Sequence, residues 1–304
     1  MESRMNGRAV FRKTLPKLFR AYPLKSGTGT IANSRAVRSL IGAWSDDVTA
    51  KVGGGSRLLV RSDDLVGRAV ILFGDLDPKV TWVVDRLLRP GDNVLDIGAN
   101  WGLVTIRAAR RVQATGHVHA IEPQESLVAY GRASVEQNRY SNITFHPIAL
   151  SEVAGMMTLT VPSDNSGAAY LGQGLDGRPG RSQTVTVEET STFLESLTVQ
   201  RWRLWKIDVE GHEAAVLRGA LRYLRGHQRP DVILFEEHRK PTVDAESVRL
   251  LQSLGYDMFG MPRAIFRLRL QPLTRERDTA HDVVAVNRDS RPELERALRI
   301  ARRR

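Results

Sequence analysis

The alternation of short apolar runs with helical patterns, from residue 93 to residue 287, constrains the fold of this 304-residue chain more than any other feature. The apolar runs are about four to eight residues long, as in strands that are buried on both faces. The segments between them carry apolar residues every three or four positions, which is typical of helices that pack on a sheet. This pattern predicts a parallel sheet with helices on both faces.

Five strands and the helices between them can be placed from this pattern. We expect strands at residues 93–97, 117–121, 143–150, 204–209 and 231–235. We expect helices at residues 103–112, 125–139, 212–224 and 243–254. Two late segments, 256–259 and 283–287, are predicted to form a terminal antiparallel hairpin. The predicted fold class is therefore α/β, with an open doubly wound sheet and not an eight-fold barrel.

The residues before this pattern are expected to form an appendage and the start of the domain. Prolines and glycine-rich runs interrupt every periodic element before residue 57. We therefore predict three parts, which are a basic N-terminal extension at 1–56, a domain at 57–290 and a basic C-terminal tail at 291–304. Within the domain, residues 57–60 and 68–73 are expected to be strands. Asp77-Pro78 is expected to open a helix over residues 79–88.

One long segment breaks the alternation. Residues 156–161 and 184–187 have the composition of strands, and residues 162–181 between them are rich in glycine, serine and aspartate. A long excursion of this kind inside a domain is often a lid or a substrate loop. Plain disorder is the alternative, and the sequence favours neither.

The net charge of +11 is concentrated at the two ends of the chain. Residues 1–38 carry nine Lys or Arg and one acid, and residues 288–304 carry seven Arg and three acids. The residues between them have a net charge near zero, which argues against a nucleic-acid substrate, because such an enzyme needs basic residues beside its active site. The basic ends either contact an anionic membrane surface or polyphosphate, or are simply solvated. The N-terminus also has the composition of a transit peptide.

Composition narrows the location and the chemistry further. No stretch approaches about 18 consecutive apolar residues, so no membrane-spanning helix is predicted. The N-terminus lacks the apolar core of a secretory signal. The chain has no cysteine, which excludes disulfides, thiolate chemistry and zinc–sulfur sites. The expected location is cytoplasmic, either free or peripheral at a membrane surface through the basic ends.

The segment VLDIGANWG, at residues 94–102, joins the first expected strand of the sheet to the first helix after it. Gly98 and Gly102 allow the backbone to turn sharply and to approach a ligand closely. A dinucleotide fingerprint would need glycines where Asn100 and Leu103 stand, so the loop is not built for a pyrophosphate. Asp96 is expected to point into the pocket and to attract the ammonium group of an amino-acid moiety. Alternatively, Asp96 and Asn100 only cap the helix.

Glu122 closes the second expected strand in the segment HAIEP. A carboxylate at this position of a nucleotide-binding sheet accepts hydrogen bonds from both ribose hydroxyls. Helix capping by Asp96 and Asn100 does not explain this residue. Together, the glycine loop and Glu122 predict a nucleoside ligand that carries an amino-acid moiety and no phosphate.

Five segments, in this order and spacing, resemble the FkbM-type methyltransferases; they are LDIGANWG, AIEP, ITFHPIALSEVAG, WKIDVEGHEAAVLRGA and ILFEEH. The resemblance covers about residues 60–290, and KIDVEG at residues 206–211 is its most specific part. It implies the class I methyltransferase fold, a Rossmann-like, seven-stranded doubly wound sheet with a terminal antiparallel hairpin. It also implies S-adenosylmethionine as cofactor, with contacts from Asp96, Gly98, Ala99, Asn100, Gly102, Glu122, Pro123 and Ala149.

A methyltransferase of this kind that acts on an alcohol needs a base for the hydroxyl proton. The fourth expected strand ends in Asp208, Glu210 and His212, and the fifth ends in Glu236, Glu237 and His238. If these strands are neighbours, their side chains converge at the carboxyl edge of the sheet, where ligands bind in such folds. Asp208 and His238 are the candidates for the base or for orienting the acceptor. Lys206 is expected to pair with Asp208 or to hold an anionic substrate.

Two other interpretations of these carboxylates stay open. Asp208, Glu210, Glu236 and His238 are ligand types that suit a divalent cation, and strand alternation would allow such a site. Alternatively, Glu210 and Gly211 only cap the following helix.

Three functions follow from these residues and from the resemblance. The leading one is an S-adenosylmethionine-dependent O-methyltransferase whose partner is a small-molecule or carbohydrate acceptor, such as a glycan, a lipid-linked sugar or a polyketide. The second is a nucleic-acid or protein methyltransferase. The third is a non-catalytic scaffold whose basic ends bind a membrane or a partner. The charges retained at Asp96, Glu122 and Asp208 argue against the scaffold.

Overall fold

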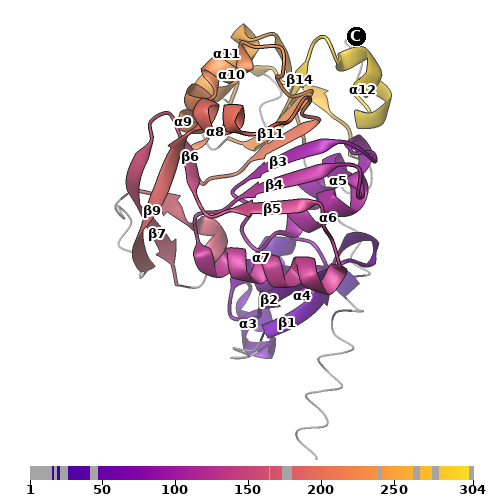
Figure 1. Cartoon of the computed structure of the whole chain (residues 1–304). Coiled ribbons are helices and arrows are strands. Elements are labelled where there is room, and N and C mark those ends of the chain that lie inside the picture. The colour runs from indigo at the N-terminus through magenta and orange to yellow at the C-terminus, as the bar shows by residue number, and fades with distance from the viewer. Residues whose placement is uncertain are drawn as a thin grey trace, which may run out of the picture.

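A mixed β-sheet forms the centre of the protein (Figure 1). The computed structural model describes residues 16, 19–20, 27–41, 47–163, 165–172, 180–237, 242–262, 268–275 and 281–300. Within these residues the sheet has eight strands. Their order from one edge to the other is β5 (Ile143–His146), β4 (His117–Ile121), β3 (Asn93–Ile97), β10 (Leu204–Ile207), β11 (Val232–Glu236), β14 (Asp282–Asn287), β12 (Tyr256–Gly260) and β13 (Gln271–Pro272).

The direction of the strands confirms the predicted α/β class. The five strands from β5 to β11 are parallel to one another. β14 lies between β11 and β12 and is antiparallel to both, so the terminal antiparallel pair occurs where it was expected. The expected number of seven strands is exceeded in the described part because the two-residue strand β13 pairs with β12 at the edge.

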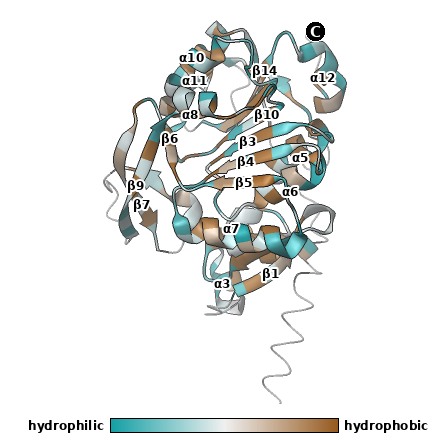
Figure 2. Ribbon diagram, viewed as in Figure 1, coloured by the Kyte–Doolittle hydropathy of each residue, from teal (hydrophilic) through white to brown (hydrophobic). Residues whose placement is uncertain are grey.

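Helices cover both faces of the sheet, and alternating strand residues form a separate core on each face. On one face, Leu95 and Ile97 pack with side chains of α8 (Thr190–Ser196), α9 (Glu213–Gly219), α10 (Leu221–Leu224) and α11 (Glu246–Ser253). On the other face, Val94 packs with α5 (Pro78–Leu87), α6 (Leu103–Val112) and α12 (Arg291–Leu298). Figure 2 shows the hydrophobic residues concentrated in the central strands. No helix in the described part is both long and apolar enough to cross a membrane.

One predicted strand is a helix. Residues 68–73, expected to be extended, lie in α4 (Leu65–Phe73), which Asp64 caps by accepting a hydrogen bond from the backbone N–H of Gly67 at 3.1 Å. The residues from Val66 to Leu72 are all buried. A helix that is buried on all sides has no polar stripe, so its apolar run cannot be distinguished from that of a buried strand.

Part of the expected N-terminal extension is folded onto the domain. β1 (Asp47–Lys51) pairs antiparallel with β2 (Arg57–Arg61) around the short helix η1 (Gly53–Gly55), so the predicted boundary at residue 56 divides a hairpin. α2 (Thr28–Ala32) packs on α4, and Thr28 Oγ1 donates a hydrogen bond to the backbone oxygen of Leu76. We call β1, β2, α2, α3 (Arg35–Ile41) and α4 the N-terminal cap.

The excursion after β5 forms a second sheet beside the first. This side sheet has the order β6 (Ala149–Ser151), β9 (Gly180–Glu189), β7 (Gly155–Pro162) and β8 (Tyr170–Leu171), and Figure 1 shows it projecting from the body. The expected strand 143–150 is thus divided between two sheets. The short helix η2 (Ser166–Ala168) precedes β8, and residues 164 and 173–179 lie outside the described residues.

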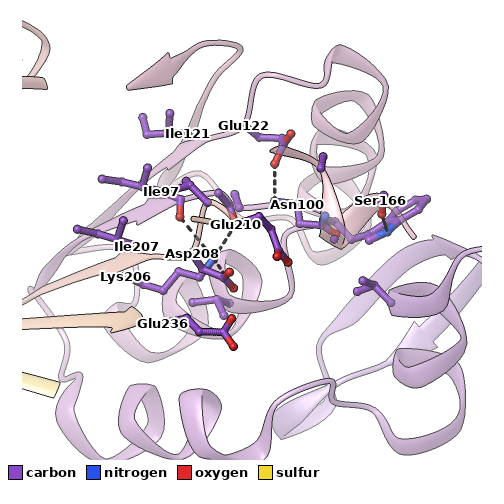
Figure 3. Close-up of a pocket in the computed structure, with 18 of the residues that line it drawn as sticks. Ile97, Asn100, Ile121, Glu122, Ser166, Lys206, Ile207, Asp208, Glu210 and Glu236 are labelled. Atoms are coloured by element: carbon purple, nitrogen blue, oxygen red, sulfur yellow. Dashed lines mark hydrogen bonds and ion pairs between the residues drawn. The ribbon is translucent and has the colours of Figure 1, made fainter. Parts of the chain in front are cut away.

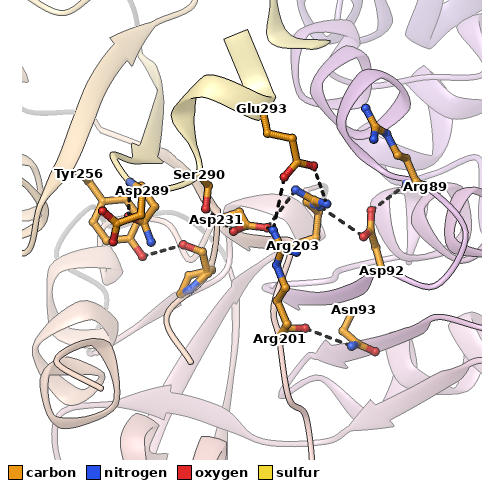
Figure 4. A network of polar contacts seen from close by, with 12 residues as sticks. Arg89, Asp92, Asn93, Arg201, Arg203, Asp231, Tyr256, Asp289, Ser290 and Glu293 are labelled. Atoms are coloured by element: carbon orange, nitrogen blue, oxygen red, sulfur yellow. Dashed lines mark hydrogen bonds and ion pairs between the residues drawn. The ribbon is translucent and has the colours of Figure 1, made fainter. Parts of the chain in front are cut away.

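The expected C-terminal tail begins as a helix that is attached to the sheet. Leu294 and Leu298 of α12 are buried against α5, and Arg86 Nε donates a hydrogen bond to the backbone oxygen of Ala297 at 2.6 Å. Figure 4 shows Glu293 beside the buried Arg203, which directly precedes β10. Arg203 Nη2 lies 3.2 Å from Glu293 Oε1. Residues 291–298 therefore belong to the folded unit. Residues 301–304 lie outside the described residues.

Candidate functional site

A cavity of about 410 Å³ lies at the carboxyl ends of β3, β4, β10 and β11 (Figure 3). This is the edge at which open α/β sheets bind ligands, and the volume lies in the range of small-molecule sites. Three parts of the chain provide most of its lining. They are the strand ends with the loops that follow them, the segment from α4 to the start of α5, and the segment from Asn165 to Leu171 of the side sheet.

The glycine turn after β3 forms the floor of this cavity. Gly98 has a φ of 76°, and a Cβ atom on it would lie 1.9 Å from the backbone oxygen of Asp208. The backbone N–H groups of Gly98 and Ala99 both donate to the backbone oxygen of Ile121, at 3.0 and 2.9 Å. Only glycine fits between β4 and β10 in this way. Gly98, Ala99 and Asn100 all line the cavity.

Asp96 does not point into the cavity, and this expectation is wrong. Its side chain is fully buried, and its Oδ2 accepts a hydrogen bond from Thr105 Oγ1 at 2.6 Å. Successive strand residues point to opposite faces. Ile97 lines the cavity, and Asp96 faces the first turns of α6 instead. Asp96 is therefore not placed to contact the ammonium group of a ligand.

The capping alternative for this loop is also wrong. The N-cap of α6 is Gly102, with a φ of 88° and no side-chain cap, and it does not line the cavity. Asn100 has a φ of 51°, and its Oδ1 accepts a hydrogen bond from the backbone N–H of Trp101 at 2.8 Å. Asn100 thus shapes the loop and leaves the helix N-terminus free of a side-chain cap.

Glu122 lines the cavity at the end of β4, as its predicted role requires. Only 3% of the residue is exposed. Its Oε2 accepts the backbone N–H of Asn100 at 2.8 Å, and its Oε1 accepts that of Gln124 at 2.9 Å. Burial raises the pKa of Glu122. Because each carboxylate oxygen has a second lone pair, the group can still accept hydrogen bonds from a ligand. The predicted cofactor contacts Pro123 and Ala149 line the cavity too.

Lys206 fastens the glycine turn to β10. Its Nζ donates to the backbone oxygen of Gly98 at 2.6 Å and forms ion pairs with Asp96 at 3.3 Å and Asp208 at 3.6 Å. The expected pairing with Asp208 is confirmed. Burial by itself would lower the pKa of Lys206, but the two carboxylates outweigh it and raise the pKa above its ordinary value. Lys206 therefore stays protonated and holds the backbone of the glycine turn against β10.

Three carboxylates line the cavity near Lys206, namely Asp208, Glu210 and Glu236 (Figure 3). Glu210 has a φ of 50°, in the left-handed region. Glu213, buried at the start of α9, holds this turn because its Oε1 accepts the backbone N–H groups of Val209 at 3.0 Å and Gly211 at 3.3 Å. The N-cap of α9 is His212, so the interpretation of Glu210 as a helix cap is wrong.

The surroundings of Glu210 raise the pKa of its carboxyl group, a property that the sequence did not indicate. Burial, followed by the negative charges of Asp208, Glu236 and Glu213, raises the pKa of Glu210 to about 8. A carboxyl group with a pKa near neutrality can both release and accept a proton under ordinary conditions. The left-handed turn that places Glu210 beside Asp208 has no signal in the sequence except the glycine at position 211.

The remaining candidates are placed as follows. His238 lies outside the described residues. His212 lines the cavity, and its Nε2 lies 2.9 Å from Ser151 Oγ. Burial lowers the pKa of His212. Among the residues that the structure describes, no group of three or more His, Asp or Glu side chains is arranged to hold a metal ion.

The segment after β7 covers the glycine turn. Trp101 Nε1 donates to Asp64 Oδ1 at 3.0 Å and lies 2.9 Å from Ser166 Oγ. The backbone N–H of Ser166 donates to Asp64 Oδ2 at 2.7 Å. These hydrogen bonds join the segment between β7 and β8 to the N-terminal cap beside the cavity. Described residues of the excursion thus line the cavity, as either a lid or a substrate loop would.

Comparison with known proteins identifies a family whose pattern matches the sequence of this chain. The family pattern of the Methyltransferase FkbM domain matches residues 96–258, which is more than half of the chain. A stretch of 83 residues is 35% identical to the Ribosomal RNA large subunit methyltransferase E of Sorangium cellulosum (strain So ce56). That match spans 27% of this chain and only 37% of the relative.

Solved structures similar to this chain include one O-methyltransferase and one putative O-methyltransferase. A putative O-methyltransferase from Klebsiella pneumoniae has a TM-score of 0.40 and 16% identity, over 70% of this chain and 82% of that chain. The O-methyltransferase TomG from Streptomyces achromogenes has a TM-score of 0.40 and 12% identity, over 70% of this chain and 81% of that chain.

Proposed function

The chain belongs to the FkbM methyltransferase family, and on this premise we propose that it transfers the methyl group of S-adenosylmethionine to a hydroxyl group of a carbohydrate or another small molecule. One observation carries the proposal. The buried carboxylate of Glu122 and the carboxylates of Asp208 and Glu210 line the same cavity, on either side of the glycine turn. One cavity thus combines a carboxylate that can bind the ribose of a nucleoside with carboxylates that can accept a hydroxyl proton.

The residues of the cavity fit the proposed cofactor. Glu122 can accept hydrogen bonds from the two ribose hydroxyls through the lone pairs that the backbone leaves free. Ile148, Ala149 and Leu150 offer an apolar surface for an adenine ring on the same side. The carboxylates of this cavity would repel a phosphate, so a nucleoside without phosphate suits it better than a dinucleotide.

The chemistry of the proposed reaction divides between cofactor and protein. The sulfonium group supplies a methyl that is already activated for an in-line displacement. The protein must hold the acceptor oxygen in line, and such positioning can lower a barrier by about 7–11 kcal/mol. As the bond from the acceptor oxygen to the methyl carbon forms, the bond from that carbon to sulfur would break and leave a neutral thioether, and the hydroxyl proton would pass to a carboxylate. Asp208 and Glu210 are the groups placed to receive it, and a positioned base contributes about 10²–10⁴-fold to the rate.

The charge of the cavity supports a neutral acceptor. Asp208 and Glu236 can accept hydrogen bonds from hydroxyl groups, as sugars require. Among the residues that the structure describes, the lysines near the cavity are engaged, Lys206 with the glycine turn and Lys79 with Asp282. In the described part of the cavity an anionic acceptor would therefore meet the carboxylates of Asp208, Glu210 and Glu236. This favours a carbohydrate over a nucleic acid, although one short match is to a ribosomal RNA methyltransferase.

Methyl transfer can be tested directly with isotope-labelled S-adenosylmethionine. The purified chain is incubated with free sugars, lipid-linked sugars, polyketides and ribosomal RNA, and mass spectrometry locates the labelled methyl. We expect a methyl ether on a sugar or small molecule, and at least about a hundredfold slower transfer by D208N. Label in RNA would establish the nucleic-acid alternative. Cofactor binding without transfer to any acceptor would favour the non-catalytic scaffold.

The basic ends are proposed to bring the enzyme to an anionic membrane surface. Their concentration of Lys and Arg supports this, since each basic residue near such a surface contributes about 1 kcal/mol. Co-sedimentation with vesicles that contain anionic lipid should be lost when residues 1–15 and 301–304 are deleted. Equal sedimentation of the shortened chain would contradict the proposal.

A further inference from the structure

One buried side chain, that of Asp64, holds two segments that line the cavity. Its Oδ1 accepts hydrogen bonds from Trp101 Nε1 at 3.0 Å and from the backbone N–H of Gly67 at 3.1 Å. Its Oδ2 accepts the backbone N–H of Ser166 at 2.7 Å. Asp64 is only 8% exposed, and it does not itself line the cavity. It therefore acts on the cavity through the loop after β3 and the segment after β7.

Both of these segments also contact residues that Glu122 holds (Figure 3). Trp101 directly follows Asn100, whose backbone N–H donates to Glu122 Oε2. The backbone oxygen of Ser166 accepts a hydrogen bond from Gln124 Nε2 at 3.4 Å. The backbone N–H of Gln124 in turn donates to Glu122 Oε1. The carboxylate at the end of β4 is thus linked to both segments, one through each of its oxygens.

These contacts place the turn from Asn165 to Gly167 beside the Glu122 end of the cavity. The three residues of the turn all line the cavity. A Cβ atom added to Gly167 would lie 2.9 Å from the side chain of Val66 and 3.9 Å from Asn100 Nδ2, so the turn packs closely against α4 and the loop after β3. A ligand whose ribose is bound by Glu122 would therefore lie within reach of this turn.

We propose that Asp64 is a positioning residue for the cofactor, which holds the turn from Asn165 to Gly167 in contact with the nucleoside part of the ligand. The inference rests on the proposed function, because that function places the ribose at Glu122. A turn that is already held in place costs the ligand less free energy to order, so the ligand binds more tightly. Asp64 lies before the family match, which begins at residue 96, so the site extends beyond the matched segment.

The position of the turn also predicts which ligands depend on Asp64. S-adenosylmethionine and its product S-adenosylhomocysteine carry the same ribose and base and differ only at the sulfur. Because the turn lies beside the residue that is proposed to bind the ribose, both ligands should depend on Asp64 to a similar degree.

The D64N variant removes one of the three hydrogen bonds and keeps the shape of the side chain. Asparagine caps a helix about as well as aspartate, and its Oδ1 can still accept the N–H groups of Gly67 and Trp101. Its Nδ2 is a donor and cannot accept the N–H of Ser166. Loss of a hydrogen bond to a charged group changes an equilibrium by about 10- to 100-fold. We therefore expect titration calorimetry of the full chain to show about tenfold or greater weakening of both ligands.

D63N is the matched control, because it makes the same chemical change at the neighbouring position. The side chain of Asp63 is 44% exposed and pairs with Arg61 at the surface. We expect D63N to bind both ligands with the affinity of the wild type. Thermal unfolding verifies that each variant is folded.

S166P removes the same hydrogen bond from the donor side. Proline has no N–H and fits the first position of a helix, and Ser166 is the first residue of η2. This variant leaves Asp64 and the cap of α4 unchanged, and it should weaken both ligands as D64N does. In the double variant the two losses should not add, because both changes remove one interaction.

Hydrogen exchange of residues 165–171 supplies a readout that a purely stabilising role would not give. We expect bound S-adenosylhomocysteine to slow this exchange in the wild type, and we expect faster exchange in ligand-free D64N. Wild-type affinity in folded D64N, or additive losses in the double variant, would overturn the inference and leave the proposed cofactor standing. If the folded wild type binds neither ligand, the proposed function fails and the inference fails with it.

Discussion

At the scale of single residues, the site depends on backbone conformations that most residues avoid. Asn100 and Glu210, on the two loops that meet at the cavity, have φ values of 51° and 50°. The left-handed region costs a residue with a Cβ atom about 1–2 kcal/mol. Glu122 holds the first loop through the N–H of Asn100, and Glu213 holds the second through Val209 and Gly211. Buried carboxylates thus hold strained loops in place, as is common at functional sites.

The G98A variant tests how tightly the two loops are joined. The new Cβ atom would overlap the backbone oxygen of Asp208, 1.9 Å away, at a φ of 76°. We expect the free energy of unfolding to fall by about 2–5 kcal/mol, from overpacking and backbone strain together. G55A is the matched control, because Gly55 has a φ of 89° and a Cβ atom added to it would have no neighbour within 4 Å. It should lose only about 1–2 kcal/mol. Equal losses in urea denaturation would contradict the close approach.

Residue roles were predictable where strand periodicity alone decides them. Glu122 stands at the end of an apolar strand, and it lines the cavity as predicted. Asp96 was assigned to the ligand from its place in the motif, although alternation along β3 turns it toward Thr105. The raised pKa of Glu210 depends on burial and on the charges of Asp208, Glu236 and Glu213, and the last two come from other elements, so no local pattern reveals it.

At the scale of elements, β3, α6 and β4 have the predicted bounds because turn residues separate short periodic runs. α4 was predicted as a strand because its burial on all sides removed the helical stripe. The division of residues 143–150 between β5 and β6 could not be predicted either. Both strands are apolar. β6 leaves the main sheet because it pairs with β9, which lies about 30 residues further along the chain.

Three histidines lie side by side on the outer strands of the sheet. His119 Nδ1 is 3.1 Å from His146 Nε2, and the ring of His119 also contacts those of His117 and Trp202. Burial, followed by the nearness of His117 and His146, lowers the pKa of His119 to about 4. Burial also lowers the pKa of His117 and of His146. These rings are therefore neutral at neutral pH and pack as aromatic side chains.

This cluster predicts loss of stability in acid. In the unfolded chain His119 takes up a proton near pH 6.5, whereas in the folded chain it does so only near pH 4. The unfolded state thus binds more protons between these values, and stability falls as the pH falls through that window. We expect His119 to account for about 1–3 kcal/mol of the loss, because it is partly exposed. Urea unfolding of H119F at pH 7 and pH 5 should show a smaller difference than the wild type; an unchanged difference would contradict this account.

At the scale of the whole molecule, the cavity is closed by parts of the chain that lie far apart in sequence. Asp64 of the N-terminal cap binds Ser166 of the side sheet across 102 positions. The family match at residues 96–258 leaves the cap outside. Leu65 and Val66 of the cap line the cavity and fall inside the predicted domain, whereas no described residue of the predicted extension 1–56 lines it. Contacts over such distances leave no periodic trace, so the sequence predicted the sheet but not the enclosure of the cavity.

The opposite end of the sheet is joined to α12 by a network of charges around Arg203 (Figure 4). Arg203 is 7% exposed and lies 3.3 Å from Asp92, 3.0 Å from Asp231 and 3.2 Å from Glu293. Removing it takes the buried cation away from Asp92 and Asp231, whose side chains are mostly buried, and loss of one partner of a buried ion pair costs about 3–5 kcal/mol. We therefore expect R203A to lower the free energy of unfolding by this amount and to loosen α12.

The matched control for this network is R201A. The Arg201 side chain is 59% exposed, although it also pairs with Asp231, at 2.9 Å. Exposed pairs contribute about 0–1 kcal/mol, so this variant should be nearly as stable as the wild type. Similar losses in R203A and R201A, measured by denaturant unfolding, would show that burial of the network is unimportant.

The central claim, that the cavity holds S-adenosylmethionine with Glu122 on its ribose, is tested most directly by titration calorimetry of the full chain. We predict saturable binding to the wild type, about tenfold or greater weakening in E122A, and unchanged binding in E125A, whose side chain is exposed at the start of α7. Absence of binding to the folded wild type, or equal affinity in E122A and E125A, would contradict the account.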